Sequence, residues 1–161
     1  MEPPSKHSIA ILNQSGRRAP RALIARAISA TLDLHKAKPS SVSVLLCDDS
    51  EMQALNLRFR KLDEPTDVLT FPAGHAPGEP LGDIAISVPY AERQAKARRV
   101  SLNQEVGYLA IHGALHLMGF DDESEPDRQV MVREMNKAAT AAGLKPDEEW
   151  ASILHGAETT T

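Results

Sequence analysis

Hydrophobic and polar residues repeat along the chain with two periods, one of two residues and one of three to four residues. The two-residue alternation, typical of β-strands, occurs in four segments. Ser41 to Leu46 (Ser-Val-Ser-Val-Leu-Leu) is the clearest, because its alternation and its β-branched residues together predict a strand. Ser8 to Leu12 alternates more weakly and leads into the turn-prone Asn-Gln-Ser-Gly. Asp67 to Phe71 and Leu81 to Val88 are the other two predicted strands, joined by a loop rich in glycine and proline.

The longer period, with apolar residues three and four positions apart, predicts helices. Ser101, with Gln104 three residues later, forms a capping box, and Pro20 suits a first helical turn. Five helices are predicted: Pro20 to about Leu32, Asp48 to about Arg58, Pro89 to about Arg99, Ser101 across His112 and His116, and Ser124 to about Ala142. Asp48, Asp49 and Ser50 are the cap candidates of the second helix. Gly143 and Pro146 end the last one.

The helix that begins after Ser101 has a wide apolar face, so we predict that it is central. Helices and strands interleave, while the closeness of the two middle strands argues against a purely parallel sheet. We therefore predict a single α+β domain over residues 1–161, with a mixed four-stranded sheet packed around a central helix and further helices outside it. The first few residues and about 156–161 are expected to be flexible, although Trp150 is available for packing.

Composition narrows the class of protein. At 161 residues and 42% hydrophobic content, the chain suffices for one domain with a real core. A net charge of −4 argues against coating nucleic acid through bulk charge, though clustered arginines leave room for a local basic patch. Cys47 is the only cysteine, which excludes an intrachain disulfide and a cysteine-based metal site. Without a signal-peptide pattern or an apolar run long enough to cross a bilayer, we expect a cytoplasmic protein with no membrane partner.

The segment from His112 to Asp122 predicts a metal site. His112 and His116 are four residues apart on a predicted helix and therefore project from the same face, where they can bind one ion. Gly119 can end that helix in a left-handed conformation, so that the Asp122 carboxylate approaches the same ion. Asp121 is the alternative third ligand.

Two other interpretations of these residues stay open. The histidines could form a hydrogen-bonded structural cluster, and Asp122 could cap the last helix. If a metal binds, three protein ligands leave one position open for water, and zinc lowers the pKa of such water toward about 7, which favours hydrolysis. A carboxylate in place of a third histidine should weaken this effect and makes manganese or another divalent ion an alternative to zinc.

Gly113 argues against a peptidase. The helical pair is close to the zinc-protease signature His-Glu-x-x-His, in which the glutamate is the general base, but Gly113 occupies the position of that glutamate. Elsewhere, Asp67 and Asp83 are predicted to be structural hydrogen-bonding residues, and His75 is predicted to lie in solvent.

The run His112-Gly-Ala-Leu-His-Leu-Met-Gly-Phe-Asp-Asp122 resembles the motif of the YbeY family of bacterial endoribonucleases, His-Gly-x-Leu-His-Leu-x-Gly-Tyr-Asp-His. Two more segments agree: Leu55-Asn-x-x-Phe-Arg60 leading into Pro65-Thr-Asp-Val-Leu-Thr-Phe-Pro72, and Leu81-Gly-Asp-Ile-Ala-Ile-Ser87. The chain departs from the family at two positions, where Asp122 replaces the third histidine ligand and Phe120 replaces the tyrosine.

The resemblance implies a single-strand-specific, metal-dependent endoribonuclease that acts in ribosomal RNA maturation, at the 3′ end of the 16S RNA, and in ribosome quality control. It implies one divalent ion, expected to be zinc, bound by His112, His116 and Asp122. Arg60 matches the functional arginine of the family, and a guanidinium of this kind would hold a phosphate by paired hydrogen bonds. The expected partners are single-stranded RNA, ribosomal RNA and the small ribosomal subunit, with no DNA.

Two other functions remain as alternatives. The chain could be a non-catalytic ribosome-assembly factor with a structural metal, and Asp122 makes this more credible than a histidine would. A metallopeptidase is the more distant alternative because of Gly113.

Overall fold

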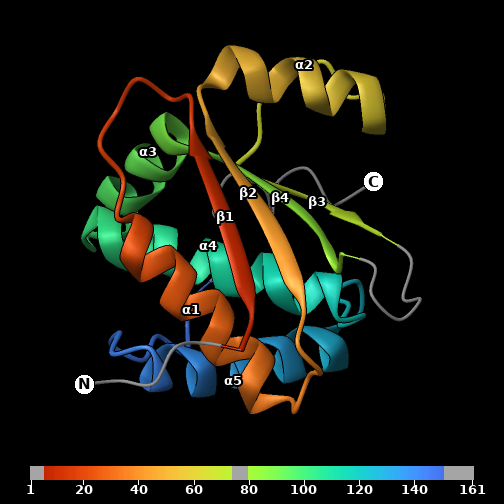
Figure 1. Ribbon diagram of the computed structural model, residues 1–161. Helices are drawn as coiled ribbons and strands as arrows, with labels where there is room; N and C mark the ends of the chain where they lie inside the picture. The colour runs from red at the N-terminus through yellow and green to blue at the C-terminus, as the bar shows by residue number, and fades with distance from the viewer. Residues whose placement is uncertain (1–5, 74–79, 151–161) are drawn as a thin grey trace.

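A four-stranded sheet forms the centre of the computed structural model, which describes residues 6–73 and 80–150 (Figure 1). The predictions for His75 and for both chain ends, residues 1–5 and 156–161, fall outside the described residues. Among the described residues, no helix combines the length and apolar character needed to cross a membrane. The elements are β1 (Ser8–Asn13), α1 (Arg21–Leu34), β2 (Ser41–Cys47), α2 (Asp49–Arg60), β3 (Val68–Pro72), β4 (Gly82–Ser87), α3 (Val88–Arg98), α4 (Leu102–Leu117) and α5 (Glu125–Ala141).

The sheet is mixed, in the order β1-β2-β4-β3. β1, β2 and β4 run parallel, joined by connections that carry helices. β3 runs antiparallel to β4, with Val68 opposite Ile86 and Pro72 opposite Gly82. This pairing confirms the predicted α+β class and mixed sheet, and it leaves β3 as an edge strand.

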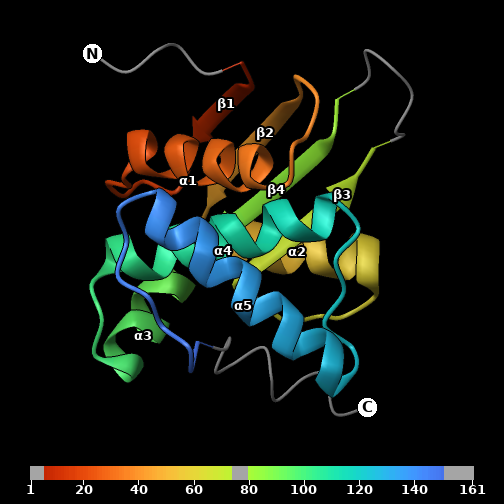
Figure 2. The same ribbon diagram turned by 90° about the horizontal axis from the view of Figure 1, so that it is seen from below.

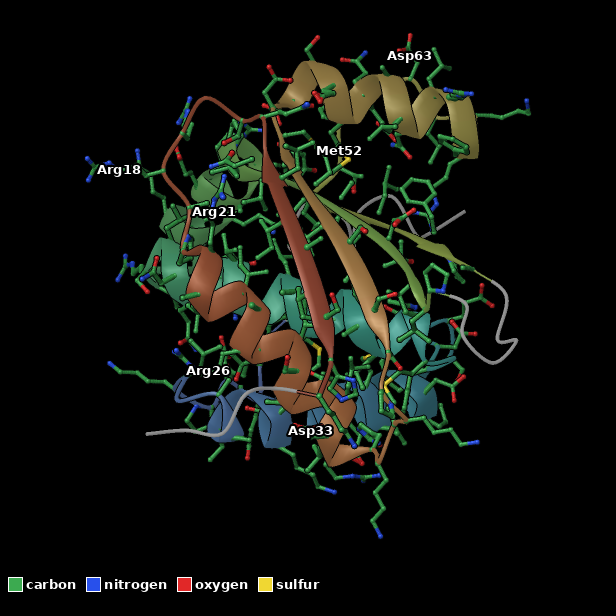
Figure 3. All side chains as sticks on the ribbon, in the orientation of Figure 1. Arg18, Arg21, Arg26, Asp33, Met52 and Asp63 are labelled. Carbon is green, nitrogen blue, oxygen red and sulfur yellow. The ribbon has the colours of Figure 1, made fainter. Side chains whose placement is uncertain are left out.

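Each face of the sheet packs on different helices because successive strand residues point to opposite sides. Val44 and Ile84 belong to the large core that includes α1, α4 and α5. Leu45 and Ala85 belong to a smaller cluster with Met52 of α2. Figure 2 shows α1 and α4 on one side of the sheet with α5 outside them, and Figure 3 shows Met52 pointing from α2 toward the strands on the other side.

Helix α4 is central, as predicted. Twelve of its sixteen residues are buried, and it contacts α1, α3, α5, β3 and β4. Helix α4 can approach the sheet closely because residue 113 is a glycine: a Cβ atom at this position would lie 3.0 Å from Cγ2 of Ile84 on β4. The sheet thus fixes how deeply the histidine-bearing helix sits.

The predicted helix starts are largely correct. Asp48, Ser101 and Ser124 each accept a hydrogen bond from the backbone N–H three residues later. Only half of the predicted capping box forms, because the side-chain amide of Gln104 instead exchanges hydrogen bonds with the backbone of Lys145. A tertiary partner has replaced the local one.

Candidate metal site

His112 and His116 lie on consecutive turns of α4, at its C-terminal end. Their Nε2 atoms are 3.0 Å apart, and the two rings meet nearly edge to face, with centroids separated by 4.5 Å. The side chain of His112 is 9% exposed and that of His116 is 25% exposed. The pair therefore presents two ring nitrogens toward one point that solvent can reach mainly on the His116 side.

The chain reverses directly after these histidines. Gly119 has φ +98, and the N–H of Phe120 donates to the carbonyl of Leu115 at 3.0 Å, which closes the helix in a Schellman-type end. A side chain at Gly119 would meet no atom within 4 Å, so backbone conformation rather than space favours glycine there. This turn directs the next residues back toward the histidines, as the sequence predicted.

Asp122 completes a three-residue cluster. Its Oδ2 atom lies 3.6 Å from Nε2 of His112 and 3.7 Å from Nε2 of His116. Ligands of a tetrahedral zinc ion at bond lengths of about 2.0–2.1 Å are separated by about 3.4 Å. The three atoms are close to this spacing, so His112, His116 and Asp122 fit a single divalent ion and form a group that could hold a metal.

Asp121 does not join this group. Its Oδ1 atom accepts hydrogen bonds from the backbone N–H groups of Asp122 and Glu123, at 2.7 and 3.3 Å. Ser124, rather than Asp122, caps α5. Asp121 therefore shapes the loop, and the alternative in which Asp122 serves as the helix cap is wrong.

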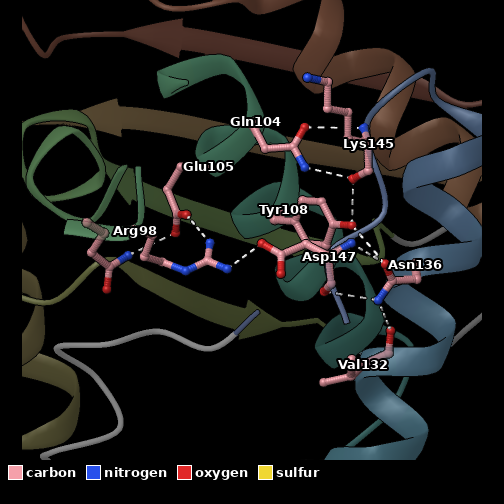
Figure 4. Close-up of polar contacts among 9 residues, drawn as sticks. Arg98, Gln104, Glu105, Tyr108, Val132, Asn136, Lys145 and Asp147 are labelled. Atoms are coloured by element: carbon pink, nitrogen blue, oxygen red, sulfur yellow. Dashed lines mark hydrogen bonds and ion pairs between the residues drawn. The ribbon is translucent and has the colours of Figure 1, made fainter. Parts of the chain in front are cut away.

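Trp150 covers the buried side of the site. Its ring centroid lies 5.3 Å from that of His112 and 6.1 Å from that of Tyr108, and Trp150 is only 6% exposed. It belongs to the segment that follows α5, which is tied to α4 by a hydrogen bond from the Tyr108 hydroxyl to the carbonyl of Lys145; the same hydroxyl also contacts Oδ1 of Asn136 on α5 (Figure 4). Burial raises the pKa of Tyr108 to about 12, so this hydroxyl remains a donor at neutral pH.

A buried ion network holds the same segment from the other side (Figure 4). Arg98 of α3 contacts both Glu105 of α4 and Asp147, and Gln94 also donates to Glu105 at 3.2 Å. Glu105 is fully buried, and this burial raises the pKa of its carboxyl against the opposing effect of Arg98. The sequence carries one signal for this network, since Glu105 is a charge at helical spacing from Leu102 and Leu109, on the apolar face of the central helix.

Arg60 lies apart from the three-residue cluster. It is exposed in the last turn of α2, across the sheet from α4 (Figure 2). Asp67, predicted to be structural, is buried and accepts hydrogen bonds from its own neighbours Thr66 and Val68. The structure thus gathers the three predicted metal ligands, whereas Arg60 belongs to a helix on the other face of the sheet.

Comparison with known proteins connects this geometry to a family. Residues 10–143 match the family model described as Endoribonuclease YbeY. A protein named Endoribonuclease YbeY from Carboxydothermus hydrogenoformans is 40% identical over 124 residues, which cover 76% of this chain and 86% of that protein. One of the same name from a Synechococcus species is 42% identical over 134 residues, covering 77% of this chain and 79% of the relative.

A solved structure is also similar. The solution structure of TM1509 from Thermotoga maritima superposes with a TM-score of 0.61 at 26% identity, over 83% of this chain and 88% of that one. With a family model that matches most of its length and relatives near 40% identity, the chain belongs to the YbeY family of endoribonucleases.

Proposed function

We propose that this metal-dependent endoribonuclease cuts single-stranded RNA and acts in ribosomal RNA maturation, at the 3′ end of the 16S RNA, and in ribosome quality control. The proposed setting is the cytoplasm, with the small ribosomal subunit as partner. Family membership supports an RNA substrate. The observation that carries the chemistry is the convergence of His112, His116 and Asp122 at separations of 3.0, 3.6 and 3.7 Å.

We infer that these three side chains bind one divalent ion, with zinc as the expected metal. Such an ion supplies Lewis acidity toward a phosphodiester oxygen or a water molecule. Two neutral imidazoles and one carboxylate give the ligand set a charge of about −1, which lowers this acidity compared with a set of three histidines. Asp122 therefore tunes the site and retains the capacity to bind metal.

The three proposed ligands differ in how far they are exposed to solvent. His112 is held between α4 and Trp150 and is shielded from water, so it defines the position of the site. His116 and Asp122 are more exposed, at 25% and 33% of their side chains, and so leave the approach for substrate on their side. The hydrogen bonds that Arg128 donates to the carbonyls of Asp122 and Glu123 steady the loop on that open side.

We propose that Arg60 holds a phosphate of the RNA by paired hydrogen bonds. Arg60 comes from α2, which packs on the opposite face of the sheet from α4, and this supports a contact with the strand beyond the scissile bond. Arg60→Glu is therefore expected to impair RNA cleavage while leaving folding and metal content intact. Normal processing of ribosomal RNA by this variant in depleted cells would refute the role.

Metal content measured beside cleavage tests the main proposal. His112→Ala and Asp122→Ala should lose stoichiometric zinc and cleavage of a single-stranded RNA together, whereas Asp122→His should bind zinc more tightly. Asp121→Ala is the matched control, because its side chain bonds only to the loop backbone, and it should keep the metal. Stoichiometric zinc in both His112→Ala and His116→Ala would overturn the site.

A non-catalytic assembly factor is the second candidate, and the aspartate at the third ligand position favours it. The two functions differ in turnover: the assembly factor binds RNA without cutting it at any metal loading. A peptidase is disfavoured by Gly113, because the glutamate such an enzyme needs would press its Cβ into Ile84.

A further inference from the structure

The C-terminal end of α2 carries an unusual surface. Leu57, Phe59 and Leu62 are 49%, 54% and 42% exposed, and among the described residues only Leu12 and Leu34 are comparably exposed large hydrophobic residues. The residues between them are cations, namely Arg58, Arg60 and Lys61, all exposed. We call residues 57–62 the α2 surface. Its local charge is opposite in sign to the net charge of the chain, −4.

Phe59 is the aromatic residue of this surface. Its ring meets the ring of Phe71 on β3 edge to face, with centroids 5.0 Å apart, and the guanidinium of Arg58 lies 5.1 Å from its centroid. This packing fixes the ring while about half of the residue stays in water. A fixed, exposed ring beside cations is the arrangement with which proteins bind single-stranded nucleic acid, because every base can stack on it.

Two exposed acidic residues, Asp63 and Glu64, follow this surface, against its three cations. Asp63 accepts a hydrogen bond from the side-chain amide of Gln53 on α2, at 2.9 Å. The centre of a protein interface is enriched in aromatic residues and arginine but depleted of charge as a whole, whereas here three cations, Lys61 among them, alternate with the exposed apolar side chains. The charge pattern therefore favours a polyanion over a protein partner.

The end of β3 connects the α2 surface with the metal site. Phe71 contacts Phe59 on the α2 side of the sheet. On the other side, Leu117 lies against Gly82, which is also beside the backbone of Phe71. Leu117 directly follows His116. Phe59 and the metal ligands are thus on opposite sides of the same end of an edge strand, and no further strand lies beyond it in the described sheet.

We propose that the α2 surface binds the single-stranded RNA substrate, with Phe59 stacking on a base while Arg58 and Lys61 contact neighbouring phosphates. The strand then passes over the edge of β3 toward His116 and Asp122. This inference rests on the proposed function and adds the place where the substrate is held. RNA binding by this surface then depends on the aromatic ring of Phe59, and an apolar side chain of similar size cannot replace it.

Fluorescence anisotropy with a labelled single-stranded oligoribonucleotide, in chelator so that no cleavage occurs, tests the stacking role. Phe59→Leu keeps an apolar side chain but removes the ring, and a stacked base contributes about 1–3 kcal/mol, so binding should weaken about fivefold to 150-fold. Phe59→Tyr should bind within about twofold of the unmodified protein, because the ring remains. Leu12→Ala, which truncates another exposed apolar residue, should not change binding.

The salt dependence of binding tests the cations. Lys61→Ala should reduce the slope of log Kd against log salt by about 0.7, the value for one phosphate contact with a single strand. Zinc content and urea unfolding measured on each variant establish that the site and the fold are intact.

Several results would overturn the inference. The first is unchanged RNA binding by Phe59→Leu, and the second is an equal loss of RNA affinity in Phe59→Leu and Leu12→Ala. The third is a dimer of the unmodified protein that Phe59→Leu dissociates, because this result would assign the surface to a second copy of the chain. RNA binding that depends on Phe59 without any cleavage by the metal-loaded protein would instead refute the proposed function and leave this inference standing.

Discussion

Removing the cation from the buried ion network should cost a large part of the stability of this fold. Arg98 is 10% exposed and lies 2.7 Å from Glu105, a carboxylate that is completely buried, and it also contacts Asp147 (Figure 4). Arg98→Met keeps most of the side-chain volume but leaves Glu105 with the neutral donor Gln94. Breaking a buried pair in this way typically costs about 3–5 kcal/mol. Because domains unfold with about 5–15 kcal/mol, the loss should be obvious.

The pH dependence of this loss follows from Glu105. Burial raises the pKa of its carboxyl in the folded protein. A group with a raised folded pKa stabilises the protein below its unfolded pKa, and this contribution disappears as pH rises through the folded pKa. Without Arg98 the pKa should rise further. The deficit of Arg98→Met should therefore be largest near pH 7 and should shrink as the pH falls, until Glu105 is protonated in both states below its ordinary pKa of about 4.5.

Urea unfolding at pH 7 and at lower pH measures both effects. Lys96→Met, an exposed cation on the same helix, is the control and should change the free energy of unfolding by less than about 0.5 kcal/mol. Adding Glu105→Gln to Arg98→Met should recover part of the loss, because the fully buried carboxylate is replaced by a neutral amide, while Asp147, 18% exposed, still lacks its cation. A loss below about 1 kcal/mol for Arg98→Met at pH 7, or a deficit independent of pH, would refute this account.

Three further predictions concern single residues. Gly113→Ala should destabilise the fold by about 1–2 kcal/mol, since its Cβ would press on Ile84; Ile84→Val should relieve part of this in the double variant, and additive losses in urea would contradict the contact. Gly119→Ala should cost about 1–2 kcal/mol because φ is +98, and it should weaken zinc binding by displacing Asp122; unchanged zinc affinity would show that the turn does not position that ligand. Burial raises the pKa of Cys47 to about 12 from 9.0, so the folded state should lose up to about 4 kcal/mol as pH rises from 9 to 12; Cys47→Val should lack this part of the alkaline loss, and parallel pH profiles would disprove it.

The sequence alone was enough wherever the cause is local. A helix places residues four positions apart on one face, which brought His112 and His116 together, and a glycine at positive φ turned the chain so that Asp122 joined them. The hydrogen bonds of Asp121 to its own loop could not be read from spacing, because Asp121 and Asp122 are adjacent and only the folded loop distinguishes them.

Tertiary packing decided the rest. Among arginines that look alike in the sequence, Arg98 contacts the buried Glu105 while Arg60 is exposed in the last turn of α2, and the residues around each arginine do not distinguish them. The contact of Phe59 with Phe71 likewise depends on which face of β3 lies against α2. Backbone geometry and side-chain periodicity act over a few residues, so they can be predicted from the sequence. Strand order and helix placement instead bring together residues that are far apart along the chain. The partners of a charged or aromatic side chain are therefore known only from the folded structure.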